Sequence, residues 1–218
     1  MAHQENLFHH IPVDTLDFER LAHAQGFQSV AGVDEVGRGP LAGPVMAAAV
    51  ILPQGLNIPG VDDSKKLSSH KRELLFDVIT AKALSIGIGT IDPEIIDSIN
   101  ILQATRLAML NAVQQLEPQP DYLLIDGITP LNTGIPQKTI KKGDSLSLSI
   151  AAASIIAKVT RDRLMVEMDL LYPGYGFSGH KGYGSALHLE ALRQLGPSPI
   201  HRLTFGGVKE HVACTSFR

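Results

Sequence analysis

The sequence VAGVDEVGRGPLAGP, residues 30–44, places an apolar, β-prone run directly before two adjacent carboxylates and a Gly-Arg-Gly turn. Adjacent residues of a strand point to opposite faces, so Asp34 and Glu35 reach one ion only where the strand bulges or ends. Carboxylates bind hard cations, and an arginine between glycines can approach a phosphate and fork onto it. The stretch favours a metal-dependent phosphoryl-transfer site. The alternative is a strand that frays into a polar turn, with Arg38 paired to one solvated acid.

The composition indicates a folded protein from a reducing compartment. The chain has 218 residues, of which 44% are apolar, which suits one domain with a buried core. Its single cysteine, Cys214, cannot form an internal disulfide or a thiolate metal cluster. The N-terminus lacks the features of a secretory signal, and the longest apolar stretch, residues 41–52, is too short to cross a bilayer. We expect a cytoplasmic monomer without membrane contact. It should form a single domain over residues 1–218, with a lead-in helix within 1–28 and a tail at 206–218.

Charge is distributed unevenly along the chain. The formal net charge of -3, taken alone, argues against a polyanionic partner. Residues 137–163 nevertheless hold six basic side chains against Asp144 and Asp162, a local net charge of +4. The six are Lys138, Lys141, Lys142, Lys158, Arg161 and Arg163. The segment suits contact with nucleic acid, although a solvated face would give the same charge run.

Hydrophobic periodicity predicts an α/β fold. Strands are expected at residues 29–34, 44–52, 83–91, 122–125 and 134–140, and helices at 14–26, 70–82, 92–116, 147–171 and 185–195. Asp14 is the expected cap of the first helix. The first two strands should be antiparallel because their link is too short for a crossover helix. Residues 122–125 are continuously apolar, as in an interior strand, and Pro136 indicates an edge strand.

Three further aspartates each have a structural and a functional interpretation. Asp126 follows the interior strand, at the end where sheets with crossover helices hold their chemistry, or it caps the next turn. Asp144 precedes the helix at 147–171 and either caps it or faces Asp126. Asp162 lies between two arginines and is expected to be an ion-pair partner rather than a ligand.

Two loops hold basic residues that suit a phosphate. In residues 54–69, Ser64 and Lys65 either contact a phosphate or only precede the N-cap serine of the next helix. In HKGYG, residues 180–184, Lys181 and Tyr183 stand among glycines. Aromatic faces stack on sugars and bases, while lysine and histidine suit phosphates. Arg202, in the tail, is a further candidate for nucleic-acid affinity.

Six segments together resemble bacterial ribonuclease HII, in that family's order and across residues 30–205. They are DEVGRGPLAGPV at 34–45, DSKKLS at 63–68, LLIDG at 123–127, GDSLSLSIAAASIIAKVTRD at 143–162, HKGYG at 180–184 and HRLTF at 201–205. The set is far more specific than any one segment, and no position expected to be catalytic departs from the family pattern.

The resemblance implies a ribonuclease H-like fold, a mixed five-stranded sheet flanked by helices with a C-terminal helical region. It implies an endonuclease that hydrolyses the RNA strand of RNA/DNA hybrids and cuts 5′ of single ribonucleotides in duplex DNA, leaving 3′-hydroxyl and 5′-phosphate ends. The family uses Mg²⁺ or Mn²⁺, with two ions when substrate is bound. Matching positions give a catalytic and metal-binding set of Asp34, Glu35, Asp126 and Asp144. They give a substrate-binding set of Gly37, Arg38, Gly39, Lys65, Lys181 and Tyr183.

The residue types agree with this chemistry. Carboxylates without a cysteine or histidine ligand set indicate hard cations. Crowded acids repel, so at least one pKa should be raised without metal, and metal affinity should rise with pH. The alternatives are ribonuclease HIII, which has an extra N-terminal domain, another nuclease of the same fold, or a nucleic-acid-binding module without catalysis. Such a module has no use for acids that repel phosphates unless metals bridge them.

Overall fold

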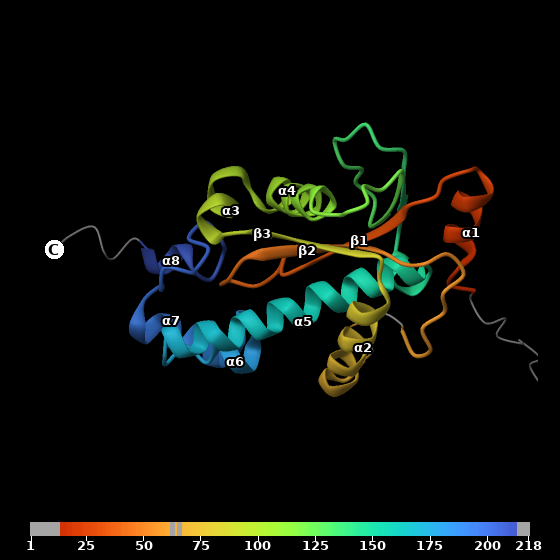
Figure 1. Cartoon of the computed structure of the whole chain (residues 1–218). Coiled ribbons are helices and arrows are strands. Elements are labelled where there is room, and N and C mark those ends of the chain that lie inside the picture. The colour runs from red at the N-terminus through yellow and green to blue at the C-terminus, as the bar shows by residue number, and fades with distance from the viewer. Residues whose placement is uncertain (1–13, 62–63, 65–66, 213–218) are drawn as a thin grey trace, which may run out of the picture.

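The computed structural model describes residues 14–61, 64 and 67–212, which form a five-stranded mixed sheet with helices on both faces (Figure 1). The strand order is β3-β2-β1-β4-β5, with β1 (Val30–Val36), β2 (Val45–Ile51), β3 (Ser85–Ile91), β4 (Tyr122–Asp126) and β5 (Gln137–Ile140). The helices are α1 (Asp17–Ala24), α2 (Ser69–Lys82), α3 (Pro93–Ile99), α4 (Ile101–Gln114), the 3-10 turn η1 (Gly143–Ser145), α5 (Leu148–Leu171), α6 (Phe177–His180), α7 (Ala186–Leu195) and α8 (Lys209–Val212). The predicted α/β class and mixed sheet are confirmed. No helix in the described part of the chain has the length and apolar character to cross a membrane.

β1 lies in the middle of the sheet and fixes the positions of its neighbours. β2 runs antiparallel to β1, as the short link predicts, whereas β4 runs parallel to β1 on the other side. The parallel pairing matches Val33 with Ile125. The next residues of the two strands, Asp34 and Asp126, therefore lie side by side at one end of the sheet.

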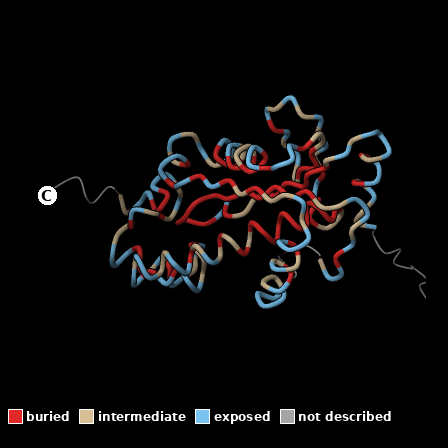
Figure 2. The backbone as a smooth tube through the Cα atoms, in the orientation of Figure 1, coloured by how far each residue is buried: buried red, intermediate tan, exposed pale blue. Residues whose placement is uncertain are grey.

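Two apolar layers enclose the sheet. α3 and α4 cover one face, and α5 with α2 covers the other (Figure 1). One layer includes Ile96 and Val113, and the other includes Ile79 and Ile155. β1 and β2 are buried over most of their length between these layers (Figure 2). A carboxylate at the end of β1 is therefore held on a rigid, desolvated support.

α5 approaches β1 closely because both contribute small residues. Ala151, Ala152 and Ala153 are buried in the first turns of α5. A Cβ built at Gly32 of β1 would lie only 2.1 Å from the main-chain carbon of Ser149. Only glycine leaves room for the helix at this distance. The contact fixes the start of α5, and with it the preceding turn η1, against β1.

Asn100 divides the single long helix expected at residues 92–116. Its φ is 70°, which ends α3, and its side-chain oxygen accepts hydrogen bonds from the Leu102 and Gln103 N–H groups, which begins α4. Asparagine tolerates the left-handed region and caps helices well. The expectation of one continuous helix is therefore wrong.

The ends of other elements also differ from expectation. Asp14 does not cap α1, which begins at Asp17; it accepts a hydrogen bond from the Leu16 N–H and pairs with Arg20. β1 continues to Val36, past both acids. α6 lies in a segment expected to be loop, and α8 lies in the expected tail.

Candidate active site

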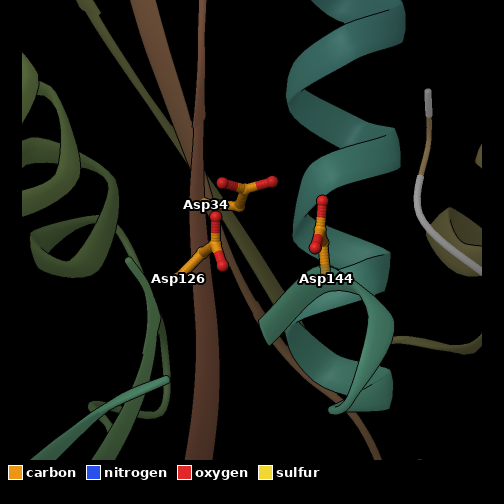
Figure 3. Close-up of side chains that lie close together, drawn as sticks. All are labelled: Asp34, Asp126 and Asp144. Carbon is orange, nitrogen blue, oxygen red and sulfur yellow. The ribbon is translucent and has the colours of Figure 1, made fainter. Parts of the chain in front are cut away.

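Three aspartates from separate segments meet at one end of the sheet (Figure 3). Asp34 lies near the end of β1, Asp126 is the last residue of β4, and Asp144 lies in η1. One carboxylate oxygen from each lies within 4.8 Å of the others. The Gly143 N–H donates a 2.6 Å hydrogen bond to Asp126 Oδ1, which ties η1 to the strand end. Of the two interpretations of Asp144, the one facing Asp126 is confirmed, because Ser147 caps α5 instead.

The three carboxylates form a site of concentrated negative charge with little solvent. Asp34 and Asp144 are buried. Burial raises the pKa of Asp34 well above its usual range, and the neighbouring charges of Glu35 and Asp126 raise it further. This confirms the expected raised pKa. A cluster of oxygen donors whose negative charge is destabilised in this way suits a hard divalent cation, which neutralises the repulsion and replaces the lost water.

Glu35 lies outside the three-carboxylate cluster because β1 stays regular through it. The pairs Asp34–Ala48, Glu35–Ala47 and Val36–Met46 follow in order, so the expected bulge or strand end at the two acids is not observed. Glu35 accepts a 3.2 Å hydrogen bond from Arg38 Nη1. It lines a cavity of about 340 Å³ together with Arg38, Arg106 and Asp126. Burial raises the pKa of Glu35, and Arg38 opposes the rise.

Arg202 supports the Gly-Arg-Gly turn by binding its carbonyl groups. Its side chain is fully buried, at 0% exposure. Its Nη2 donates to the carbonyls of Gly37 at 2.5 Å and Gly43 at 2.9 Å, its Nη1 to the carbonyl of Arg38 at 3.0 Å, and its Nε to Gly43 at 3.0 Å. Burial lowers its pKa to about 9, so it remains a cation at neutral pH. Arg202 is therefore a support for the turn, and of the candidates for nucleic-acid affinity it is one whose charge is not available to a phosphate.

Arg161 joins the segment that follows this turn to the HKGYG loop. It is also fully buried, and it donates to the carbonyls of Ala42 at 3.0 Å, Pro44 at 3.0 Å and Lys181 at 2.9 Å. The Leu41 N–H donates to the Gly182 carbonyl at 2.8 Å. Burial lowers the pKa of Arg161 to about 10. Arg161 therefore does not contribute to the basic surface that was expected from the sequence at residues 137–163, because its guanidinium is buried.

Tyr183 lies directly against the Gly-Arg-Gly turn. A Cβ built at Gly39 would be 3.7 Å from Tyr183 Cε1, and the tyrosine side chain is 45% exposed. Arg38 and Gly39 are exposed as well. Lys181 is half-buried, and its ammonium donates to the Ser178 carbonyl. The two loops therefore meet where Tyr183 contacts Gly39, whereas Gly37 is buried beneath the exposed part of its turn.

The remaining sequence candidates divide between surface and interior. Lys65 lies outside the described residues. Ser64 is buried and shares a 2.9 Å hydrogen bond with Ser154 of α5, so its hydroxyl is directed to the helix rather than to a phosphate. Asp162 forms an ion pair with Lys158 at 2.6 Å, which confirms its expected structural role. Arg163 pairs with Glu73.

Sequence reasoning missed the two buried arginines, and only one had a detectable signal. Arg161 lies four residues after Ala157 and eight after Ala153, so the helical period places it on the buried side of α5. Arg202 lies beyond the last long helix, where no period indicates burial.

A buried carboxylate cluster at the end of a mixed sheet, beside an exposed arginine and tyrosine, defines a divalent-metal-dependent nuclease. The family model for ribonuclease HII matches residues 31–208. Ribonuclease HII of Pelobacter propionicus is 65% identical over 98% of this chain and 97% of its own. That of Geobacter metallireducens is 67% identical over 90% of this chain and 92% of its own. The chain belongs to the ribonuclease HII family.

The fold agrees with that membership. The crystal structure of ribonuclease H2 from Pyrococcus horikoshii superimposes with a TM-score of 0.72 at 28% identity, covering 86% of this chain and 98% of its own. As a family member the chain is a divalent-metal-dependent ribonuclease H, which acts on the RNA strand of RNA/DNA hybrids.

Proposed function

We propose that this enzyme cuts duplex DNA on the 5′ side of a single embedded ribonucleotide, as well as the RNA strand of hybrids, and leaves 3′-hydroxyl and 5′-phosphate ends. The observation that carries the proposal is the contact of the Tyr183 ring with Gly39, four residues after Glu35. This contact puts an aromatic ring and an exposed main-chain turn beside the carboxylate cluster. Such a surface can read one sugar next to the phosphate that is cut.

Asp34, Glu35, Asp126 and Asp144 would hold Mg²⁺ or Mn²⁺, two ions when substrate is bound. Asp34, Asp126 and Asp144 already converge, and Glu35 lines the same cavity as Asp126. The chemistry that the bound ions supply is activation of water and charge stabilisation at the scissile phosphate and the departing 3′-oxygen. The protein residues hold their carboxylates in place and exclude water, and no side-chain nucleophile is needed.

Selectivity for ribose must come from recognition of the 2′-hydroxyl. Arg202 binds the carbonyls of Gly37 and Arg38, and within the described residues the Arg38 and Gly39 N–H groups have no hydrogen-bond acceptor. Amides left available on an exposed turn can bind a sugar hydroxyl without reading the base. The Tyr183 ring, against Gly39, would pack on the adjoining sugar and detect the change from RNA to DNA.

Phosphates on either side of the cut need cations. Arg38 is exposed beside Glu35, Lys181 is half-buried in the loop that contains Tyr183, and both suit this role. Lys65 remains a candidate from the sequence alone. The single cysteine in the sequence suits a reducing compartment, and we include a cytoplasmic location and a monomeric state in the proposal.

The test is cleavage of an end-labelled DNA duplex that holds one ribonucleotide, mapped on a sequencing gel with Mg²⁺, with Mn²⁺ and with a chelator. We expect one cut, 5′ of the ribonucleotide, that requires metal, and no cut in an all-DNA duplex. Tyr183→Phe keeps the ring and removes an exposed hydroxyl that can bind the substrate, so it should lower this cleavage about threefold to tenfold, the effect of one hydrogen bond. Tyr122→Phe, at the opposite end of β4 from Asp126, is the matched control and should not change it. A cut 3′ of the ribonucleotide, or cutting of the all-DNA duplex, would refute the proposed specificity.

A further inference from the structure

Three histidines, of which His188 and His201 are buried and His180 is half-buried, form a cluster that the proposed chemistry does not use. His180 ends α6, His188 lies in α7, and His201 lies in the segment after α7. The His188 ring stacks on His180 with centroids 4.4 Å apart and lies 5.1 Å from His201. Phe177 packs edge-on against His188, with centroids 5.5 Å apart. His188 and His201 are 0% and 2% exposed, so neither ring is placed to touch substrate.

The hydrogen bonds of this cluster specify which ring nitrogen holds each proton. The Ser198 N–H can only donate, and it lies 2.9 Å from His201 Nδ1, so that nitrogen accepts. The proton of a neutral His201 is therefore on Nε2, which donates to His188 Nε2 at 2.9 Å. His188 then has its proton on Nδ1, which donates to the Tyr183 carbonyl at 2.9 Å. One directed chain of hydrogen bonds thus runs from Ser198 to Tyr183.

The charge state agrees with this arrangement. Burial lowers the pKa of His188, and burial together with the neighbouring His188 lowers the pKa of His201 to about 4. Both rings are therefore neutral at pH 7. Two neutral imidazoles can share one Nε2–H···Nε2 hydrogen bond, whereas two charged ones would repel.

We propose that His188, held in one tautomer by His201, is the positioning residue that sets the Tyr183 main chain so that its ring rests against Gly39. The inference deepens the proposed function, because it rests on a role for Tyr183 in ribose recognition. The Tyr183 hydroxyl forms no hydrogen bond with another described residue, so the position of its main chain and the contact with Gly39 decide where the ring lies.

The Tyr183 carbonyl is the point at which the turn is attached to α7. It accepts from the Ser185 N–H at 2.8 Å as well as from His188 Nδ1, and Ser185 in turn caps α7 by accepting from the His188 N–H at 3.2 Å. The Gly-Arg-Gly turn is held separately by Arg202, which donates to the carbonyls of Gly37 and Arg38. The spacing between Tyr183 and Gly39 is therefore fixed from both sides.

Two amide substitutions separate the two hydrogen bonds of His188. His188→Asn puts an amide nitrogen where Nδ1 stood, so it keeps the bond to the Tyr183 carbonyl and loses the bond to His201. His188→Gln puts the amide near the former Nε2, so it keeps the contact with His201 and loses the bond to Tyr183. Both variants lose the ring and its stacking, so each is the matched control of the other for packing.

The readout is the ratio of kcat/KM for the single-ribonucleotide duplex to kcat/KM for a long RNA/DNA hybrid, measured below the unfolding midpoint of each variant. We expect His188→Gln to lower this ratio about threefold to tenfold relative to His188→Asn, the effect of one hydrogen bond. The difference should vanish when both are combined with Tyr183→Ala. Equal ratios for the two variants, or a difference that persists without the tyrosine ring, would overturn the inference.

A second measurement does not depend on activity. In ¹⁵N-histidine-labelled wild-type enzyme at pH 7, the imidazole spectrum should show the Nδ1–H tautomer for His188 and the Nε2–H tautomer for His201. The opposite tautomer, or a charged ring, at either residue would overturn the inference even if both variants fail to fold. A different outcome is that both tautomers are as expected but Tyr183→Ala leaves the selectivity unchanged. That result would refute the ribose role of Tyr183 itself, and with it the function assigned to His188.

Discussion

Replacing Arg202 by lysine keeps a positive charge but removes the planar fork that supports the Gly-Arg-Gly turn. The guanidinium serves three carbonyls, those of Gly37, Arg38 and Gly43. A lysine ammonium is a single point of charge and can reach one of them, so at least one buried glycine carbonyl loses its donor. A buried unsatisfied group costs about 1–3 kcal/mol, so the free energy of unfolding should fall by at least this amount.

Urea unfolding followed by far-UV circular dichroism measures this change, because the sequence has no tryptophan for fluorescence. Arg193→Lys on α7 is the control, since Arg193 is an exposed arginine that pairs with Glu190. The control should stay within about 0.5 kcal/mol of wild type. An Arg202→Lys enzyme that is equally stable, with unchanged cleavage at a single ribonucleotide, would refute the reasoning that the buried fork holds the turn.

Other consequences concern packing and pH. Gly32→Ala should prevent stable folding, because its Cβ would lie 2.1 Å from the Ser149 main chain, and a thermal melt with a native-like midpoint would contradict this. The pKa of His201 is lowered to about 4 from an unfolded value of about 6.5, so the unfolded chain binds the proton more readily between these values. Stability from this group is complete above pH 6.5 and should fall by about 3 kcal/mol as pH drops to 4. His201→Gln should flatten that part of the profile in urea unfolding at stepped pH, and an equally steep profile would exclude His201 as its cause.

The sequence was informative where structure depends on neighbours along the chain. The strand-forming residues before Asp34 and Asp126 identify two strands of the sheet without reference to distant contacts. The helical periodicity of apolar residues over 147–171 identifies α5 in the same way. The break between α3 and α4 at Asn100 was missed because the stripe of apolar residues continues across it. The left-handed φ of Asn100 interrupts the helix although the apolar pattern does not change.

Parts of the site depend on contacts that no local pattern encodes. The position of Glu35 follows from the uninterrupted pairing of β1 with β2. The glycines after Glu35 had suggested that this pairing would end there. The burial of Arg202 depends on carbonyls more than 150 residues away in the chain, at Gly37 and Gly43. The hydrogen bond between His188 and His201 likewise joins α7 to a later segment, so residue types alone gave no sign of it.

The central claim is that the carboxylates of Asp34 in β1, Asp126 in β4 and Asp144 in η1 hold the metal that drives hydrolysis. The most direct measurement is the single-turnover rate at which wild type and Asp126→Asn cleave a labelled RNA/DNA hybrid in Mg²⁺. Asparagine keeps the oxygen that accepts from the Gly143 N–H and removes only the charge, so unfolding temperatures should agree within a few degrees. A loss of about 10³-fold or more in rate is predicted, since a metal ligand contributes several kcal/mol to the barrier. A folded Asp126→Asn enzyme that cleaves as fast as wild type would contradict the claim.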